Sequence, residues 1–316
     1  MFKKILYPIR FEAVSPDVLS SLDALSCILN FKKAGTEEIA LLHVIDVAKL
    51  PMDKYSGYSH EEVKILTEIA DSKMDEAARL IENAGLKAKK RIEVGIPYRE
   101  ILKVADEEKV SLIISGRQKR GVLGEIFIGS NTDKVIRYGT IPVYILKYPA
   151  IFGADKEACA RVCEKIFTKV LYPTDWSDCA REALKYLKAM KNAGVKEVVV
   201  AHVMNEKAMR LQPSEKFKEF KRIDKERLEM IKGELEEEGF RVKTYLHVGR
   251  VRTDLIRIAK EEDVSLIVIG THGKGYVEGI LWGSVSRNVV EYSDRPVLLI
   301  KGGECLTEGE THGNVN

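Results

Sequence analysis

The sequence predicts an α/β protein made of two tandem, doubly wound, five-stranded parallel sheets. Short apolar runs alternate with segments of helical periodicity, which is typical of parallel strands joined by right-handed crossover helices. The same motifs occur twice, in the same order, along 316 residues, so each copy is long enough to bury its own core. Duplication of one fold accounts for these ordered matches.

The two copies align by direct comparison. Three pairs of segments share residue types at matching places: residues 4–8 and 169–173, residues 110–116 and 264–270, and Gly129-Ser130 and Gly283-Ser284. We therefore expect domains at residues 1–149 and 166–302, with a linker at 150–165 and a disordered tail at 303–316.

In the first copy, five apolar runs predict strands and three periodic segments predict helices. The strands are expected at residues 4–9, 38–45, 87–94, 110–115 and 142–147. The helices are expected near residues 15–33, 59–83 and 97–109. Ser15 followed by Pro16 suits an N-cap and the first helical position, which supports the start of the first helix.

The second copy repeats this order. Its strands are expected at residues 169–173, 197–203, 241–247, 266–269 and 296–300. Its helices are expected from a cap at Ser177 to Gly194, at residues 214–238, from Thr253 or Asp254 onward, and at residues 285–292. Serine is a good N-cap residue, and Gly194 and Gly239 supply C-terminal stops.

Composition excludes several classes of function. Apolar residues make up 45% of the chain and charged residues 31%, as in a globular protein. A net charge of only +3 gives no electrostatic case for a nucleic-acid partner. No apolar run approaches the roughly 20 residues that span a bilayer, so we expect no membrane partner and a cytoplasmic location.

The cysteines do not predict a disulfide framework, because five of them, an odd number, are scattered over a long chain. Cys159 and Cys163 lie four residues apart, but no histidine is close to them in the sequence. A metal site there is therefore not expected.

A glycine loop between an apolar strand and a helical segment is the strongest local motif. Gly270, Gly273 and Gly283 have the spacing Gly-x2-Gly-x9-Gly, and Ser284 lies where a helix N-cap is expected. Such a loop can hold di- or triphosphates on helix N–H groups. It matches neither the Walker A nor the dinucleotide fingerprint. By itself it could equally be a tight turn.

A second motif converges on the same place. Asp175 follows the first strand of the second copy, and Gly270 follows the fourth. In a doubly wound sheet these two strands are neighbours at the switch point, where ligands bind at the carboxyl ends. We therefore expect both motifs to line one crevice.

Residues 170–177 (Val-Leu-Tyr-Pro-Thr-Asp-Trp-Ser), the glycine loop with its Gly-Ser ending, and the closing strand at 296–300 together resemble the universal stress protein family. The resemblance covers nearly the whole chain. It implies an adenine nucleotide alpha hydrolase-like, Rossmann-like fold and, from the glycine spacing, ATP binding. It also implies that the fifth strands pair into an intrachain pseudo-dimer, with a homodimer possible in addition.

The resemblance implies a nucleotide-binding role for a defined set of residues. The set is Pro173, Thr174, Asp175, Val203, Ile269, Gly270, Thr271, His272, Gly273, Gly283, Ser284, Val285 and Ser286. Asp175 would contact the adenosine, beside an apolar slot of Pro173, Val203 and Ile269. The glycines would leave room for ribose and phosphates, with Ser284 and Val285 on the phosphate oxygens. Mg2+ or Mn2+ would be held through the phosphates, and His272 is the one histidine expected near the chemistry.

The first copy departs from this pattern. Arg10 stands where the second copy has Asp175, and Lys119 stands where it has Gly273. An arginine has only donors, and a lysine side chain fills space that a glycine leaves open. We expect a degenerate nucleotide site here. Another anion is the competing interpretation, because Arg117 and Arg120 add positive charge.

Three functions remain open. The chain can be an ATP-binding regulatory protein of the stress response that acts on an unidentified protein partner. It can be a slow ATPase, or an autophosphorylating enzyme with Ser284 or Ser286 as acceptor. It can also be a structural pseudo-dimer without nucleotide. The sequence shows no convincing base, so we assign no catalytic residue and favour binding.

Overall fold

The computed structural model describes residues 1–11, 21–50, 52–53, 57–58, 60–116, 128–147, 163–272 and 282–301. The first half of the chain contains β1 (Lys4–Pro8), α1 (Ser21–Leu29), η1 (Asn30–Ala34), β2 (Glu38–Asp46), η2 (Val47–Lys49), β3 (Met52–Asp53), β4 (Gly57–Tyr58), α2 (His60–Asn83), β5 (Lys87–Gly95), α3 (Pro97–Glu107), β6 (Leu112–Gly116), α4 (Ser130–Tyr138) and β7 (Val143–Leu146). The small β3–β4 pair is separate from the main sheet.

The second half contains β8 (Lys169–Pro173), α7 (Asp178–Ala189), η3 (Met190–Ala193), β9 (Glu197–Asn205), α8 (Glu206–Arg210), α9 (Ser214–Glu237), β10 (Arg241–Gly249), α10 (Val251–Glu261), β11 (Leu266–Gly270), α11 (Ser284–Tyr292) and β12 (Val297–Ile300). The predicted strands are confirmed in both copies, whereas α4, α8 and the β3–β4 pair are elements that the sequence did not predict.

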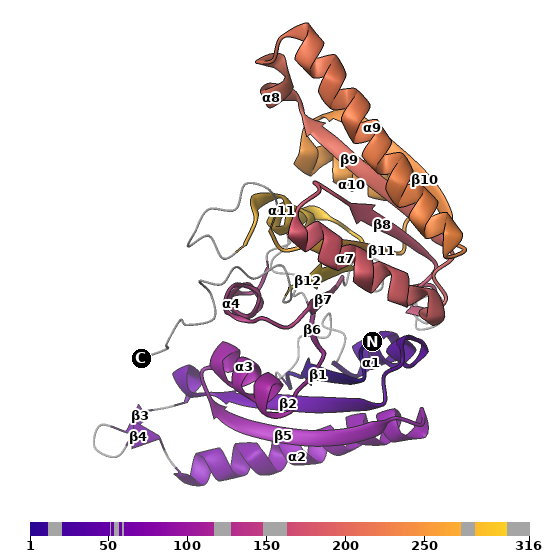
Figure 1. Ribbon diagram of the computed structural model, residues 1–316. Helices are drawn as coiled ribbons and strands as arrows, with labels where there is room; N and C mark the ends of the chain where they lie inside the picture. Colours follow the sequence, from indigo (N-terminus) through magenta and orange to yellow (C-terminus); the bar gives the residue numbers. More distant parts are fainter. Residues whose placement is uncertain are drawn as a thin grey trace.

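The two five-stranded sheets join into one ten-stranded sheet, in the order β10-β9-β8-β11-β12-β7-β6-β1-β2-β5. All neighbouring strands are parallel except at the centre, where β12 and β7 run antiparallel and Leu298 pairs with Tyr144. The halves are thus related by an approximate two-fold arrangement about this seam, with α2 and α9 at opposite ends of the molecule (Figure 1). The predicted pairing of the fifth strands is confirmed.

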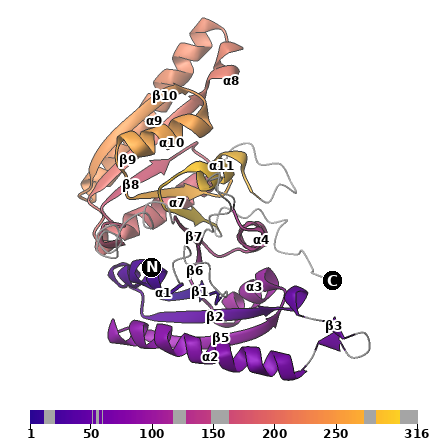
Figure 2. The ribbon, with the colours of Figure 1, turned by 180° about the vertical axis from the view of Figure 1, so that it is seen from behind.

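Each face of the long sheet carries one continuous core that spans both halves. One face is covered by α1, α2, α7 and α9, and the other by α3, α4, α10 and α11 (Figures 1 and 2). Strand residues alternate between them, as Val200 faces the first core and Val199 and Ala201 face the second. Each fully buried Val or Leu stabilises the fold by about 1.5–3 kcal/mol.

Two buried lysines cross between the halves symmetrically. Lys147 follows β7, and its Nζ donates to the carbonyl oxygen of Val290 in α11. Lys301 follows β12, and its Nζ donates to the carbonyl oxygen of Ile136 in α4. Each ammonium group lies near the C-terminus of a helix of the other half, where the helix dipole favours positive charge. These contacts fix the two halves against each other.

Aromatic side chains and a disulfide also join the halves. Phe2 stacks on Tyr186 with ring centroids 5.9 Å apart, and Phe31 meets Phe167 edge-on at 5.2 Å. Cys27 of α1 forms a disulfide with Cys163, which precedes β8. No disulfide framework was predicted from the cysteine pattern, so this bond corrects that prediction, and Cys179 is disulfide-bonded too. The cysteines are far apart in sequence, and only the packing of the halves brings Cys27 and Cys163 together.

Two helix starts differ from the prediction. Helix α10 begins at Val251, before Thr253 and Asp254, because the N–H groups of these two residues already bond to the carbonyl oxygen of Arg250. Helix α11 has Gly283 as its N-cap, so Ser284 is its first residue. The Ser177 cap is confirmed, since its hydroxyl accepts from the N–H of Ala180. Most of the predicted linker and the predicted tail lie outside the described residues.

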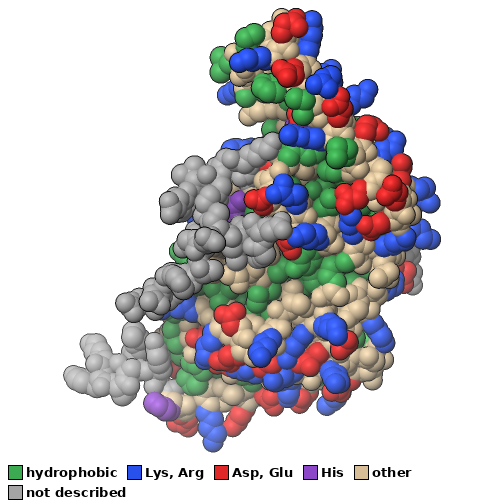
Figure 3. Space-filling view, viewed as in Figure 1, with side chains coloured by type: hydrophobic (Ala, Val, Ile, Leu, Met, Phe, Trp, Pro, Cys, Tyr) green, Lys and Arg blue, Asp and Glu red, His purple; other side chains and the backbone are tan. Residues whose placement is uncertain are grey.

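The surface agrees with the small net charge. Lys and Arg side chains are interleaved with Asp and Glu over the visible face of both halves (Figure 3). No helix within the described ranges is both long and apolar enough to cross a membrane.

Two carboxylates at the amino ends of the strands predict a stability that depends on pH. Lys4 and Lys89 lie within 2.8 Å of Glu108, and the pKa of its carboxyl falls to about 2 because Lys4 and then Lys89 bond to it. Glu262 is the equivalent in the second half, where bonds from Lys243 and then Tyr245 lower the pKa to about 2.

Because both pKa values are lower than in the unfolded chain, the stabilisation is complete above about pH 4.5 and is lost as pH falls towards 2. We expect each carboxylate to contribute on the order of 1–2 kcal/mol. Urea unfolding at steps from pH 7 to pH 2 measures this. The double variant Glu108→Gln and Glu262→Gln should be less stable at pH 7 and show a shallower slope below pH 4.5. An equal slope in parent and variant would contradict the assignment.

Candidate functional site

The predicted crevice lies where β8 and β11 end side by side. Val170 and Leu171 of β8 pair with Leu266 and Ile267 of β11, so the segments after Pro173 and after Gly270 leave the same edge of the sheet. This edge is the switch point of the sheet of the second half, since β9 and β10 continue from β8 and β12 follows β11. The structure therefore brings the two predicted motifs together.

The segment after β8 is held by its own side chains. Asp175 Oδ1 accepts from the Ser177 hydroxyl at 2.6 Å and from the Ser177 N–H at 3.2 Å. Thr174 is buried, and its Oγ1 accepts from the N–H of Trp176. Trp176 adopts a left-handed backbone with φ of 68°, which is uncommon for a bulky residue. The carboxylate of Asp175 is thus oriented before any ligand arrives.

A polar cluster on the α9 side supports this turn. His202 Nδ1 lies 2.8 Å from the carbonyl oxygen of Thr174, and its Nε2 lies 3.2 Å from Asp224 Oδ2 of α9. The imidazole also packs on Trp176, with ring centroids 4.8 Å apart, and the guanidinium of Arg227 lies over the indole. The pairing of His202 with Asp224 could not be predicted from the sequence, because it depends on how α9 packs on the sheet.

The segment after β11 contacts the segment after β8. The Ser177 hydroxyl lies 3.4 Å from the carbonyl oxygen of His272. Thr271 is buried, with its hydroxyl donating to the carbonyl oxygen of Ile300 in β12. The hydroxyl of Thr271 also lies 3.1 Å from His272 Nδ1. Thr271 therefore supports the loop from inside, whereas His272 is partly exposed at the crevice.

Two glycines of the motif are required by close packing within the protein. A Cβ on Gly270 would lie 2.7 Å from the Cβ of Cys179 in α7, and one on Gly283 would lie 2.8 Å from the carbonyl oxygen of Thr271. The N–H of Gly283 donates to that same oxygen at 2.9 Å. These contacts give a structural reason for both glycines that needs no phosphate. Gly273 lies outside the described residues.

The first turn of α11 faces the crevice and can hold an anion. Ser284 is exposed and Val285 half-exposed. Ser286 is buried, and its hydroxyl lies 2.8 Å from the carbonyl oxygen of Thr271 and 3.0 Å from that of Gly283. The N–H groups of a helix start have no intrahelical partners and carry partial positive charge. Ser284 and the first N–H groups of α11 are therefore able to bind an anion. Ser286 instead holds the loop in place through its bonds to the carbonyl oxygens of Thr271 and Gly283.

The apolar residues predicted for a base slot lie at the strand ends. Pro173 ends β8, Val203 lies near the end of β9, and Ile269 precedes the last residue of β11. Val203 and Ile269 are 7% and 6% exposed and belong to the core on the α10 and α11 face. They contribute to that core as well as to the edge of the crevice.

The first half has different chemistry at the matching place. Arg10 is exposed and follows β1. His43, the equivalent of His202, has its Nδ1 3.0 Å from the carbonyl oxygen of Ile9. Burial lowers the pKa of His43, and the charges of Lys73 and Arg10 lower it further. Lys73 and Arg10 thus place positive charge near this turn. A Cβ on Gly129 would have no neighbour closer than 3.9 Å, so this glycine is not constrained as Gly283 is.

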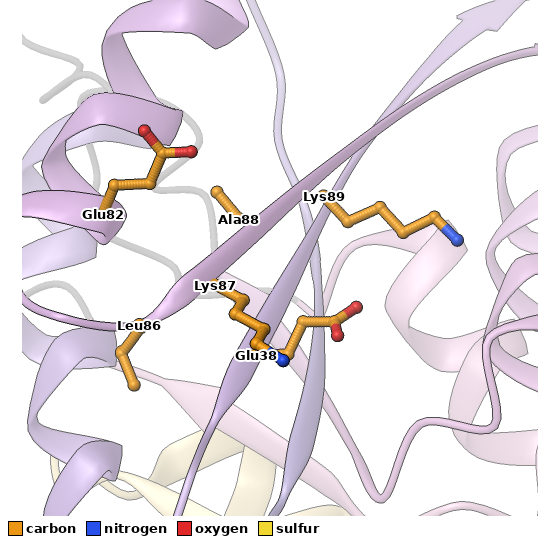
Figure 4. Close-up of a pocket in the computed structure, with 6 residues that line it drawn as sticks. All are labelled: Glu38, Glu82, Leu86, Lys87, Ala88 and Lys89. Carbon is orange, nitrogen blue, oxygen red and sulfur yellow. The ribbon is translucent and has the colours of Figure 1, made fainter.

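A hollow of about 460 Å³ lies elsewhere. It is lined by residues 38, 82 and 86–89, at the amino ends of β2 and β5 beside the C-terminus of α2 (Figure 4). It lies at the amino ends of strands of the first half, whereas the candidate site lies at the carboxyl ends of strands of the second half. Among the described residues, no group of three or more His, Cys, Asp or Glu side chains could hold a metal ion.

These features define a doubly wound α/β protein of two fused copies, with polar residues gathered at the carboxyl ends of the first and fourth strands of the second copy. The model of the Universal stress protein family matches residues 1–147 and 167–301, and the chain belongs to this family.

Known relatives agree with the duplication. Universal stress protein MJ0577 of Methanocaldococcus jannaschii is 36% identical over 155 residues, which cover 43% of this chain and 96% of the relative. Universal stress protein YxiE of Bacillus subtilis is 29% identical over 154 residues, covering 46% of this chain and all of the relative. A universal stress protein structure from Archaeoglobus fulgidus is 26% identical, covers 95% of this chain and 96% of its own, and has a TM-score of 0.69. The last resemblance extends over both copies.

Proposed function

We propose that the second half of the chain binds ATP and that the protein acts as a nucleotide-dependent regulatory member of the universal stress protein family. One observation carries the proposal: Ser177 links the oriented carboxylate of Asp175 to the loop that leads to α11. An acceptor for the adenosine and an anion-binding helix start therefore meet at one crevice.

The residues present fit a nucleoside triphosphate. Asp175 provides acceptors for ribose or base donors, and Ser284 with the first N–H groups of α11 provides donors for phosphate oxygens. Mg2+ or Mn2+ would then be held mainly through the phosphates, as is common for Mg2+ in proteins. The first half presents Arg10 where Asp175 stands, which supports one nucleotide per chain.

Binding without fast turnover is the preferred form of the proposal. Phosphoryl transfer requires a positioned nucleophile, a base and positive charge on the transferred group. If transfer to the protein occurs, Ser284 is the better acceptor, because Ser286 is 3% exposed and already bonded to backbone carbonyls.

A cytoplasmic location stays a prediction. Reducing compartments ordinarily keep cysteine pairs such as Cys27 and Cys163 as free thiols, so the disulfide does not support this prediction.

We expect the purified chain to bind one ATP and Asp175→Ala to weaken binding at least about tenfold, because hydrogen bonds to a charged group contribute roughly 1.5–3 kcal/mol. Calorimetric titration with ATP and Mg2+ measures this, after mass spectrometry of any nucleotide that copurifies. Asp175→Asn keeps one acceptor oxygen for Ser177, so it separates support of the turn from contact with the ligand.

Arg10→Ala is the matched control in the first half and should bind ATP as the parent does. The proposal fails if the parent does not bind ATP, or if Asp175→Ala binds ATP as tightly as the parent.

A further inference from the structure

His247 lies beside the proposed base slot, on the neighbouring strand. In the parallel pairing of β9 and β10, His247 is the partner of Val203. Side chains of partners in parallel strands point to the same face, so the imidazole stands next to the Val203 side chain. The pairing of β8 with β9 stops at Pro173 and Ala201. Val203 and His247 therefore lie two residues beyond the last paired residue of β8, at the edge of the sheet where the candidate site lies.

An acidic side chain lies beside this imidazole. His247 Nε2 lies 3.6 Å from Oδ1 of Asp254 in the first turn of α10. The Asp254 side chain is 14% exposed and the His247 side chain 43% exposed. Arg257 Nη2 lies 3.1 Å from the same carboxylate oxygen, so Asp254 is held as an anion acceptor. The carboxylate therefore lies on the Nε2 side of the ring.

Gly249 has no side chain, and this leaves room for the side chains of His247 and Asp254. A Cβ at position 249 would lie 2.8 Å from His247 Nε2 and would overlap Asp254 Oδ2. The first half has the same close approach between Gly95 and Glu100, but Glu93 replaces the histidine there and pairs with Arg91. The imidazole is thus found in the copy that also has Asp175.

We propose, on the basis of the proposed ATP site, that His247 is a specificity-determining residue that recognises the exocyclic amine of adenine. An uncharged imidazole has one donor and one acceptor nitrogen, and a carboxylate on the Nε2 side favours the proton there, which leaves Nδ1 as the acceptor. Adenine carries a donor amine at C6, whereas guanine and hypoxanthine carry an acceptor oxygen there. An acceptor on the protein therefore favours adenine and opposes the two other purines.

The test is titration of the full chain with ATP and with inosine triphosphate, which differs at C6. The parent should prefer ATP, and His247→Val should lose roughly tenfold of this preference, mainly through weaker ATP binding. Valine suits a strand and removes the acceptor. Asp254→Asn should also reduce the preference, because a neutral amide favours a proton on Nε2 less than a carboxylate does. Glu93→Gln is the matched control and should leave the preference unchanged.

The outcomes separate this inference from the proposed function. If the parent does not bind ATP, both are overturned. If the parent binds ATP and folded His247→Val keeps the full preference over inosine triphosphate, only the role of His247 is overturned. Circular dichroism of each variant establishes that it is folded, and loss of preference in both His247→Val and Asp254→Asn supports the proposal.

Discussion

Replacing Cys27 and Cys163 together by alanine is expected to lower the free energy of unfolding by up to about 5 kcal/mol. The disulfide closes a loop with a sequence separation of 136 residues, and the chain-entropy model gives a cost of this order for so long a loop. Both side chains are 1% exposed and lie in the core, so alanine avoids burying a new hydroxyl group there.

Urea unfolding of parent and double variant without reductant measures the effect. Reductant alone is not diagnostic, because Cys179 is also disulfide-bonded. Under strong reduction the difference between parent and variant should shrink to the small cost of two lost sulfur atoms in the core. Equal unfolding midpoints without reductant would show that the bond does not form in solution.

Gly270→Ala is expected to reduce stability by about 1–3 kcal/mol and to weaken ATP binding together with it. The new Cβ would lie within 2.8 Å of the Cβ, carbonyl carbon and carbonyl oxygen of Cys179. The carbonyl carbon and oxygen of Cys179 belong to the backbone of α7 and cannot move separately from it. The whole of α7 must therefore shift away from β11. Because Ser177 is the N-cap of α7 and bonds to Asp175, the shift would carry the proposed adenosine contact with it.

Thermal unfolding and ATP titration of the same variant check both effects. Gly129→Ala is the matched control, because the nearest atom to its Cβ would be Thr132 Oγ1 at 3.9 Å. It should change stability by less than about 1 kcal/mol and leave ATP binding unchanged. A Gly270→Ala variant as stable as Gly129→Ala would contradict the close approach of α7 to β11.

The duplicated fold could be predicted because its signals are local. The apolar run at residues 266–269 lies in β11, and Ser177 and Gly194 mark the start and end of the segment formed by α7 and η3. Periodicity, caps and left-handed glycines depend on residues within a few positions of one another. The errors were boundaries, such as the start of α10, and short elements that were not predicted, such as α4 and α8.

The location of the candidate site could also be predicted, since parallel strand order places the segments after the first and fourth strands together. What each side chain does there could not. Thr271 and Ser286 were among the residues expected to bind nucleotide, and the structure shows both buried with hydroxyls bonded to backbone carbonyls. Gly270 and Gly283 were expected to make room for a ligand, yet each is also required by a neighbouring protein atom.

The sequence by itself determined the two α/β copies, their strand order and the contrast between Asp175 and Arg10. Only the tertiary structure decided the pairing of Cys27 with Cys163 and the position of His247 beside Val203. The physical reason is the sequence separation between the residues that interact. Secondary structure and turns arise from neighbouring residues, whereas a disulfide or a pair of side chains on adjacent strands depends on register and packing between segments far apart in the chain.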